Sequence, residues 1–290
     1  MTKFFIDAYA DCSSKEAQES GLILAPSKLK IGKKIYSTND KIGFSQDEII
    51  QKIKKGFCTI IPLTIEEWTA FFRPYLQQGE DVVFFTISQI LMADGGEDLR
   101  SAFCILEDEF PERKCLLMDT LSVSRGTCEI AIMSSFVYKK EQDLQKTIEF
   151  AKKLIGRYIT VFAIDDVESL QKTNIFKKVS KNFFGTALNL KPIISINPDG
   201  NIQILEKVRG FKTATNKLYS IVAQNGENIA DYTFSIVNYN AKEEAQKLFD
   251  KFASQVEANE IRNLTIGIPN AINIGGKVVG ITFHAKKYDN

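Results

Sequence analysis

The chain has 290 residues, enough for two domains of ordinary size. Lysine and arginine number 37 against 36 aspartates and glutamates, and this balance gives no electrostatic reason to expect a nucleic-acid partner. The single histidine, His284, excludes a metal site built from several histidines.

The five cysteines form no C-x-x-C pair, and their odd number argues against a disulfide framework. No segment approaches the ~18 consecutive apolar residues of a membrane span. Asp7 and Asp11 interrupt the short apolar start, so the pattern does not indicate a signal peptide. We therefore expect a cytoplasmic protein without a membrane span.

The first half of the chain alternates strand-like and helix-like segments. We expect strands at residues 4–6, 81–87 and 115–118, and helices at 13–21, 46–55 and 99–106. Another helix begins at Thr64, where Glu67 completes a capping box, and Pro74 is expected to kink or interrupt it. Continuous apolar strands between helices predict a parallel sheet covered on both faces.

Ligands bind beyond the carboxyl ends of the strands in a parallel sheet. Four segments are expected to follow such strand ends and are the positions where a site is sought: residues 7–11, 59–63, 88–94 and 119–126.

The second half has a different pattern. We expect strands at residues 159–164, 190–196, 202–208, 232–237, 264–268 and 278–284. Pro198, Asp199 and Gly200 predict a hairpin turn between two of them, and residues 242–256 form an amphipathic helix. The sequence thus predicts an α/β domain with a parallel sheet at residues 1–156 and an α+β domain with a mainly antiparallel sheet at residues 157–290.

Six segments, taken in chain order, resemble motifs of the DegV family. They are FIDAYAD (5–11), TIIPL (59–63), VVFFTISQILMA (82–93), MDTLSVSRG (118–126), LNLKPII (188–194) followed by KVRGFKTA (207–214), and INIGGKVVGITF (272–283). The resemblance extends from one end of the chain to the other in the family's order and spacing. The chain is therefore identified as a divergent member of this family.

The resemblance implies a non-enzymatic fatty-acid carrier without a cofactor. Proteins of this family hold one acyl chain in an apolar tunnel between the two domains, with the carboxylate at its polar end. Some present that carboxylate to a separate fatty-acid kinase. Each buried methylene contributes about 0.8 kcal/mol, so the tail supplies the affinity.

The residues that bind the carboxylate in the family are largely changed in this chain. The family threonine corresponds to Thr59, but its serine corresponds to Met92 and its histidine to Asn273. Residues 173–176, which align with the family's G-G-R motif, contain no arginine. The expected polar end therefore consists of Thr59, Asn273, Tyr9 and Asp94, and it suits weakly held fatty acid, a neutral lipid or an ester.

The resemblance implies a ligand site whose members come from four parts of the chain: Tyr9, Thr59, Ile60, Ile61, Pro62, Met92, Ala93 and Asn273. These apolar residues are equally compatible with an ordinary core. Two alternatives remain open. One is an interaction module whose tunnel is filled by Met92 and Phe176, and the other is a small-molecule enzyme that uses Asp7 or Asp119.

Overall fold

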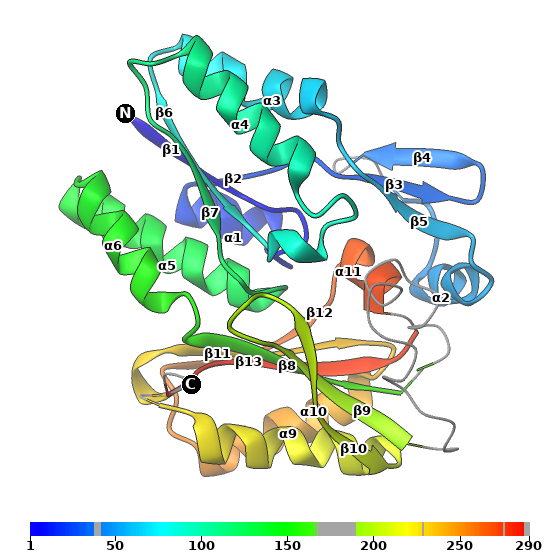
Figure 1. The fold of residues 1–290 in the computed structure, drawn as a ribbon. Coiled ribbons are helices and arrows are strands. Elements are labelled where there is room, and N and C mark those ends of the chain that lie inside the picture. Colours follow the sequence, from blue (N-terminus) through cyan, green and yellow to red (C-terminus); the bar gives the residue numbers. More distant parts are fainter. Residues whose placement is uncertain (38–41, 166, 168–189, 228, 275, 287–290) are drawn as a thin grey trace.

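The computed structural model describes residues 1–37, 42–165, 167, 190–227, 229–274 and 276–286. Within these residues the strands form three sheets, of four, six and three strands. The two larger sheets, A and C, lie one above the other in Figure 1, with helices between them and on both outer faces. The predicted fold class, a parallel sheet followed by a mainly antiparallel one, is confirmed.

Sheet A contains four parallel strands. Their order is β2-β1-β6-β7, with bounds β1 (Thr2–Ile6), β2 (Leu22–Leu24), β6 (Asp81–Thr86) and β7 (Cys115–Asp119). Successive side chains point to opposite faces. Phe4 and Ile6 pack below the sheet against α1 (Ser14–Ser20), α5 (Arg125–Glu141) and α6 (Leu144–Leu154). Phe5 and Phe84 pack above it against α3 (Ile65–Gln77) and α4 (Glu97–Glu109).

Sheet C contains six strands, of which only β11 and β12 pair in parallel. The order is β10-β9-β8-β13-β11-β12, with bounds β8 (Tyr158–Ile164), β9 (Leu190–Ile196), β10 (Ile202–Arg209), β11 (Thr233–Tyr239), β12 (Glu260–Thr265) and β13 (Val278–His284). Helices α9 (Phe211–Asn225) and α10 (Lys242–Gln255) cover its outer face. The predicted turn at Pro198–Gly200 is confirmed, since β9 and β10 pair antiparallel around it.

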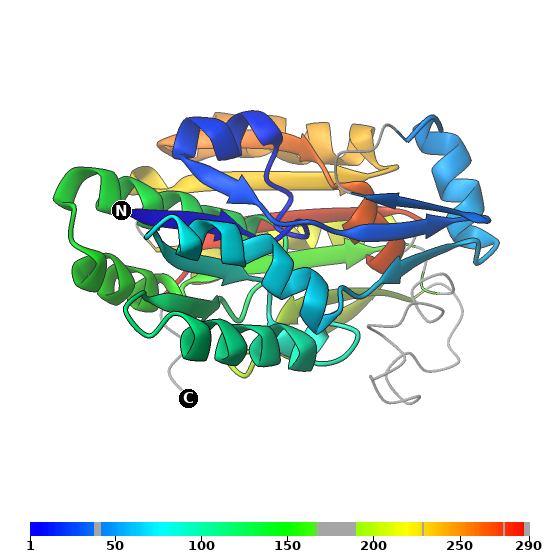
Figure 2. The same cartoon turned by 90° about the horizontal axis from the view of Figure 1, so that it is seen from above.

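The third sheet, B, was not predicted. It is a small antiparallel sheet of order β4-β3-β5, with bounds β3 (Lys28–Ile31), β4 (Lys34–Ser37) and β5 (Cys58–Ile61). Together with α2 (Gln46–Lys54) and α11 (Ile268–Ile274), it packs on the inner face of sheet C. Figure 2 shows sheet B and α2 at the end of the molecule opposite the N-terminus.

Sheet B corrects one expectation about the site. Residues 59–63 were expected to follow a parallel strand, but Thr59 to Ile61 belong to β5, an antiparallel strand. The alternation along β3 is only four residues long, and such short runs do not identify a strand on their own.

Helices α5 and α9 were missed, and two predicted elements need correction. Helix α5 was missed because ten of its residues are buried, so it lacks the apolar stripe that marks a helix with one exposed face. Helix α9 was missed too, and the strand expected at 264–268 ends at Thr265, before α11. Helix α3 is not interrupted at Pro74 but continues to Gln77.

Two single-turn helices complete the described elements, η1 (Gln89–Leu91) and η3 (Ile229–Asp231). All strands of sheet A precede Gly156 and all strands of sheet C follow it. The division into two domains at that residue stays a prediction. None of the described helices is both long enough and apolar enough to cross a membrane.

Candidate functional site

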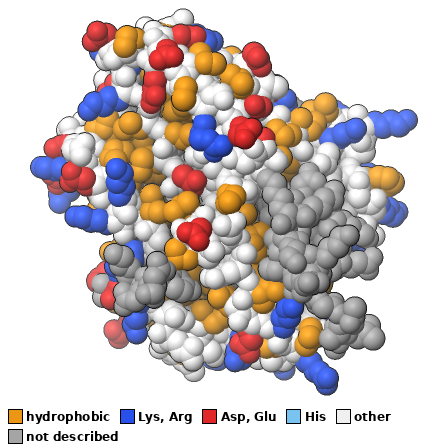
Figure 3. All heavy atoms as spheres, viewed as in Figure 1, with side chains coloured by type: hydrophobic (Ala, Val, Ile, Leu, Met, Phe, Trp, Pro, Cys, Tyr) orange, Lys and Arg blue, Asp and Glu red, His pale blue; other side chains and the backbone are white. Residues whose placement is uncertain are grey.

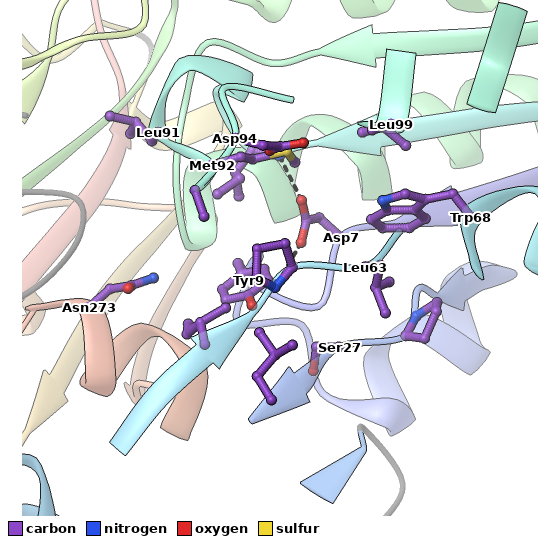
Figure 4. Close-up of a pocket in the computed structure, with 16 residues that line it drawn as sticks. Asp7, Tyr9, Ser27, Leu63, Trp68, Leu91, Met92, Asp94, Leu99 and Asn273 are labelled. Carbon is purple, nitrogen blue, oxygen red and sulfur yellow. Dashed lines mark hydrogen bonds between the residues drawn. The ribbon is translucent and has the colours of Figure 1, made fainter. Parts of the chain in front are cut away.

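A narrow pocket lies where the carboxyl ends of β1 and β6 approach β5 (Figure 4). Its empty space is about 790 Å³ with the opening to solvent included, of which about 80 Å³ admits the centre of a water molecule. Its described lining is Asp7, Tyr9, Pro26, Ser27, Ile60, Ile61, Pro62, Leu63, Trp68, Ile87, Leu91, Met92, Ala93, Asp94, Leu99 and Asn273.

One end of the pocket is apolar. Trp68 and Leu99, from α3 and α4, are 9% and 1% exposed. Figure 4 shows them together on the side away from Asn273. Trp68 stacks on Phe72, with ring centroids 6.1 Å apart, and so continues into the aromatic core above sheet A. This end offers apolar surface to the tail of a ligand.

The carboxyl group of Asp7, at the end of β1, borders the middle of the pocket. Its Oδ2 accepts hydrogen bonds from Thr86 Oγ1 at 3.0 Å and from Ile87 N at 3.2 Å, and its Oδ1 accepts one from Tyr9 N at 2.9 Å. Burial raises the pKa of Asp7, although these three donors act against that shift. The carboxyl group therefore joins the end of β1 to the end of β6, and it repels an anionic head group whenever it is ionised.

Four further polar side chains border the pocket, those of Tyr9, Ser27, Asp94 and Asn273. Asp94 accepts hydrogen bonds from the backbone N–H groups of Gly96 and Asp98, at the start of α4. Burial and the Asp7 charge raise the pKa of Tyr9, so its hydroxyl stays protonated. The carboxamide of Asn273, on α11, points into the pocket in Figure 4, and no hydrogen bond joins it to the described residues.

Seven of the eight residues that the resemblance implied for the site line this pocket: Tyr9, Ile60, Ile61, Pro62, Met92, Ala93 and Asn273. Thr59 does not. It is exposed on β5, in register with Lys30, and its hydroxyl donates to the Ile60 carbonyl at 3.4 Å. The ligand contacts of all eight residues stay a prediction.

Some predicted residues lie outside the described chain, and some residues that line the pocket were not predicted. Residues 173–176, including Phe176, lie outside the described part of the chain. Trp68 and Leu99 were missed because their apolar patterns suit any packed helix equally well. Asp7 lies at a strand end where a site was sought, and its position alone suggested that it borders a ligand.

Asp119, the other acid considered for catalysis, does not line this pocket. Its carboxylate accepts hydrogen bonds from Leu121 N at 2.9 Å and Gln89 N at 3.2 Å, and burial raises its pKa. In the described ranges, no group of three histidine, cysteine or acidic side chains is placed to hold a metal ion.

Comparison with known proteins identifies the family. The DegV family model matches residues 1–286. A DegV domain-containing protein of Streptococcus pyogenes is 22% identical over 277 residues, which cover 95% of each chain. One from Lactococcus lactis is 24% identical over 251 residues, which cover 86% of this chain and 85% of that protein.

Solved structures show the same fold. A fatty-acid-binding DegV family protein from Thermus thermophilus superposes with a TM-score of 0.81 at 21% identity, over 98% of this chain and 99% of that one. A DegV family protein from Ruminococcus gnavus, refined with vaccenic acid, has a TM-score of 0.83 at 19% identity, over 97% and 99% of the two chains. Because the family model covers almost the whole sequence, the chain belongs to the DegV family.

Proposed function

We propose that this protein is a carrier that binds one long-chain fatty acid or a related single-chain lipid in the pocket beside Asp7. The observation that carries the proposal is the lining of the pocket, which extends from the polar groups of Asn273 and Asp7 to the apolar end at Trp68 and Leu99. Each methylene group buried there contributes about 0.8 kcal/mol, so a long chain supplies most of the affinity. The fatty-acid-binding relatives with the same fold support this reading.

The head group is the part in which this protein differs from what the family resemblance implies. No lysine, arginine or histidine occurs among the described lining residues. The Asn273 amide and the Tyr9 hydroxyl are neutral donors, which hold a carboxylate less strongly than charged donors do. We infer that the pocket binds fatty acid more weakly than a site with a cation, and that it tolerates a neutral head group such as an ester.

The proposal includes no catalytic step. Asp7 and Asp119 each accept hydrogen bonds from backbone N–H groups, and these bonds hold both carboxylates in the turns that follow their strands. A kinase that phosphorylated the bound lipid would require a carboxylate held in a defined position. The described lining of the pocket offers no cation that would hold it so, and the proposal therefore includes no kinase partner.

Native mass spectrometry of the freshly purified protein tests the carrier function. We expect one lipid per chain, identified after denaturation and solvent extraction. Met92→Trp, which fills the pocket, is expected to remove the adduct. Ile90→Trp is the matched control, because Ile90 is 44% exposed and does not line the pocket. A bare protein mass after incubation with both oleic acid and a monoacylglycerol would contradict the proposal.

Asn273→Asp tests the position of the head group. The substitution keeps the size of the side chain but adds a carboxylate to a pocket that Asp7 and Asp94 already line. We expect the Kd for a fatty acid to rise by about tenfold, because a buried like charge costs more than 1 kcal/mol. The Kd for a monoacylglycerol should change much less. Displacement of a fluorescent lipid measures both values, and an equal effect on the two ligands would place the head group elsewhere.

A further inference from the structure

Two large apolar side chains are exposed close together on sheet B. Phe57 is 57% exposed and Ile35 is 54% exposed, more than any other described large hydrophobic residue except Met1. The inner face of the sheet packs on sheet C through Leu29, Ile31 and Tyr36. Because side chains alternate along a strand, Ile35 lies on the opposite, outer face.

Phe57 lies on the same outer face. It immediately precedes Cys58, which packs inward, and its carbonyl accepts a hydrogen bond from Gly32 N at 2.7 Å, in the turn between β3 and β4. Lys30 on β3 pairs with Ile35 on β4 and with Thr59 on β5, and Phe57 lies two residues before Thr59. Their backbones are therefore two strand spacings, about 10 Å, apart across the sheet and two residues, about 7 Å, apart along it, which gives a separation of about 12 Å.

Lysines occupy the segments that carry these two side chains, with Lys34 Nζ over the Tyr36 ring and Lys52 Nζ over the Phe44 ring. We define the basic tip as Lys30, Lys33, Lys34, Ile35, Lys52, Lys54, Lys55 and Phe57, from β3, β4, the end of α2 and the loop before β5. None of its six lysines lies within 4 Å of a carboxylate of a described residue. Figure 3 shows blue and orange side chains together at the edge of the molecule where Figure 1 places sheet B and α2.

The charge of the tip contrasts with the rest of the chain. Residues 28–59 contain eight lysines and three acids, a net charge of +5 in a chain whose total is +1. The remaining residues therefore carry a net negative charge. An anionic surface attracts the tip and repels the rest, and this difference orients the molecule with the tip toward the surface.

The tip is also close to the ligand pocket. Strand β5 begins directly after Phe57, and its residues Ile60 and Ile61 line the pocket. Phe57 is three residues from Ile60, which corresponds to about 10 Å along a strand. A long-chain lipid resides in a bilayer, so its carrier must meet a membrane to load or release it.

We propose that the basic tip docks the protein on anionic membrane surfaces, with Phe57 and Ile35 inserted between lipid head groups. Exposed aromatic and aliphatic side chains flanked by lysines are the usual means by which a protein lies on such a surface. The purpose of the docking rests on the proposed lipid carriage, but the docking itself requires no ligand in the pocket. An acidic protein is the competing occupant, and it would not depend on bilayer lipid.

Sedimentation of the full-length protein with vesicles tests the proposal. We expect binding to phosphatidylcholine vesicles with about one third phosphatidylglycerol, little binding to pure phosphatidylcholine, and a decrease as added salt shortens the ~10 Å Debye length. The double variant Lys33→Glu/Lys34→Glu should weaken binding by more than about tenfold, and Phe57→Ser by several-fold.

Matched controls come from elsewhere on the surface. Lys152→Glu/Lys153→Glu reverses an exposed basic pair at the end of α6, and Phe136→Ser removes a phenylalanine that is 51% exposed. Both controls should bind vesicles like the unchanged protein. Tip variants that bind normally, controls that lose binding equally, or no binding by the unchanged protein would each overturn the proposal.

Lipid content, measured on the same preparations by native mass spectrometry, separates this proposal from the carrier function. The Lys33→Glu/Lys34→Glu variant should retain a bound lipid while it loses the vesicles. Bound lipid without docking overturns only the membrane proposal. Docking without bound lipid upholds the membrane proposal and contradicts the carrier function.

Discussion

Replacing Phe72 with alanine is expected to lower the free energy of unfolding by about 3–5 kcal/mol. Phe72 lies on the inner face of α3 and is 0% exposed. Its ring lies within contact distance of five aromatic rings that belong to β1, α3, β6 and α4: Phe5, Trp68, Phe71, Phe84 and Phe103. Alanine removes the apolar surface and leaves a cavity that these rings, held by three other elements, fill only in part.

Urea unfolding measures this loss. Phe136→Ala is the control, because that ring is 51% exposed and should change stability by less than about 0.5 kcal/mol. A loss below about 1 kcal/mol for Phe72→Ala would show that the core above sheet A repacks without a cavity. In that case the apolar end of the ligand pocket, which Trp68 forms against Phe72, would also be deformable.

Replacing Arg125 with methionine is expected to cost about 3–5 kcal/mol of stability, because it leaves a buried carboxylate without its main partner. The Arg125 guanidinium, 0% exposed, lies 2.6 Å from the Glu129 carboxylate, which is 2% exposed. Arg125 also lies 3.0 Å from Glu16 on α1. Among the described residues, Glu129 would then retain Ser235 Oγ at 3.3 Å and Arg262 at 3.8 Å.

The double variant Arg125→Met/Glu129→Leu separates the stability lost because the Glu129 charge is left unpaired from the stability that the ion pair itself contributes. A buried ion pair replaced as a whole by apolar side chains is often neutral, so most of the lost stability should return. The control is Arg73→Met, because Arg73 pairs with Glu109 at 2.8 Å on the surface and should contribute about 1 kcal/mol or less. A double variant as unstable as Arg125→Met would mean that the charges themselves are required for folding.

The Arg125→Met substitution also changes how the free energy of unfolding depends on pH. Burial alone would raise the pKa of Glu16, but Arg125, Ser13 and Arg262 together lower it below its usual value. A lowered pKa contributes stability that is present above the unfolded value of about 4.5 and is lost as pH falls through the folded value. We therefore expect Arg125→Met to lose less stability between pH 5 and pH 3 than the unchanged protein, as measured by urea unfolding at each pH. An unchanged slope would mean that Arg125 does not set the pKa of Glu16.

Much of the fold follows from local patterns in the sequence. Residues 82–85 (VVFF) and 278–281 (VVGI) are continuous apolar runs, which predict strands covered on both faces, and both are buried within β6 and β13. Ser13 and Thr64 form the capping boxes that start α1 and α3, since each hydroxyl accepts from the backbone N–H three residues later. These features depend on neighbours in the chain, so the sequence alone determined them.

The candidate site was predictable only in part. The family resemblance indicated Tyr9, Ile60, Met92 and Asn273, which lie far apart in the chain and line one pocket. It also indicated Thr59, whose side chain faces solvent on the outer face of sheet B. A motif gives the position of a hydroxyl in the sequence but not the face of the strand on which it lies. A shift of one residue along the strand moves a side chain to the opposite face.

Tertiary structure alone decided the rest. Helix α5 carries the buried charges Arg125 and Glu129 between the two large sheets, and no local pattern distinguishes these from charges on an exposed helix. The apolar end of the pocket depends on how α3 and α4 pack over sheet A, which brings Trp68 and Leu99 together. The basic tip likewise exists because β3, β4 and β5 pair across some 30 residues of sequence. Each of these features arises from contacts between distant segments, and local propensity carries no information about them.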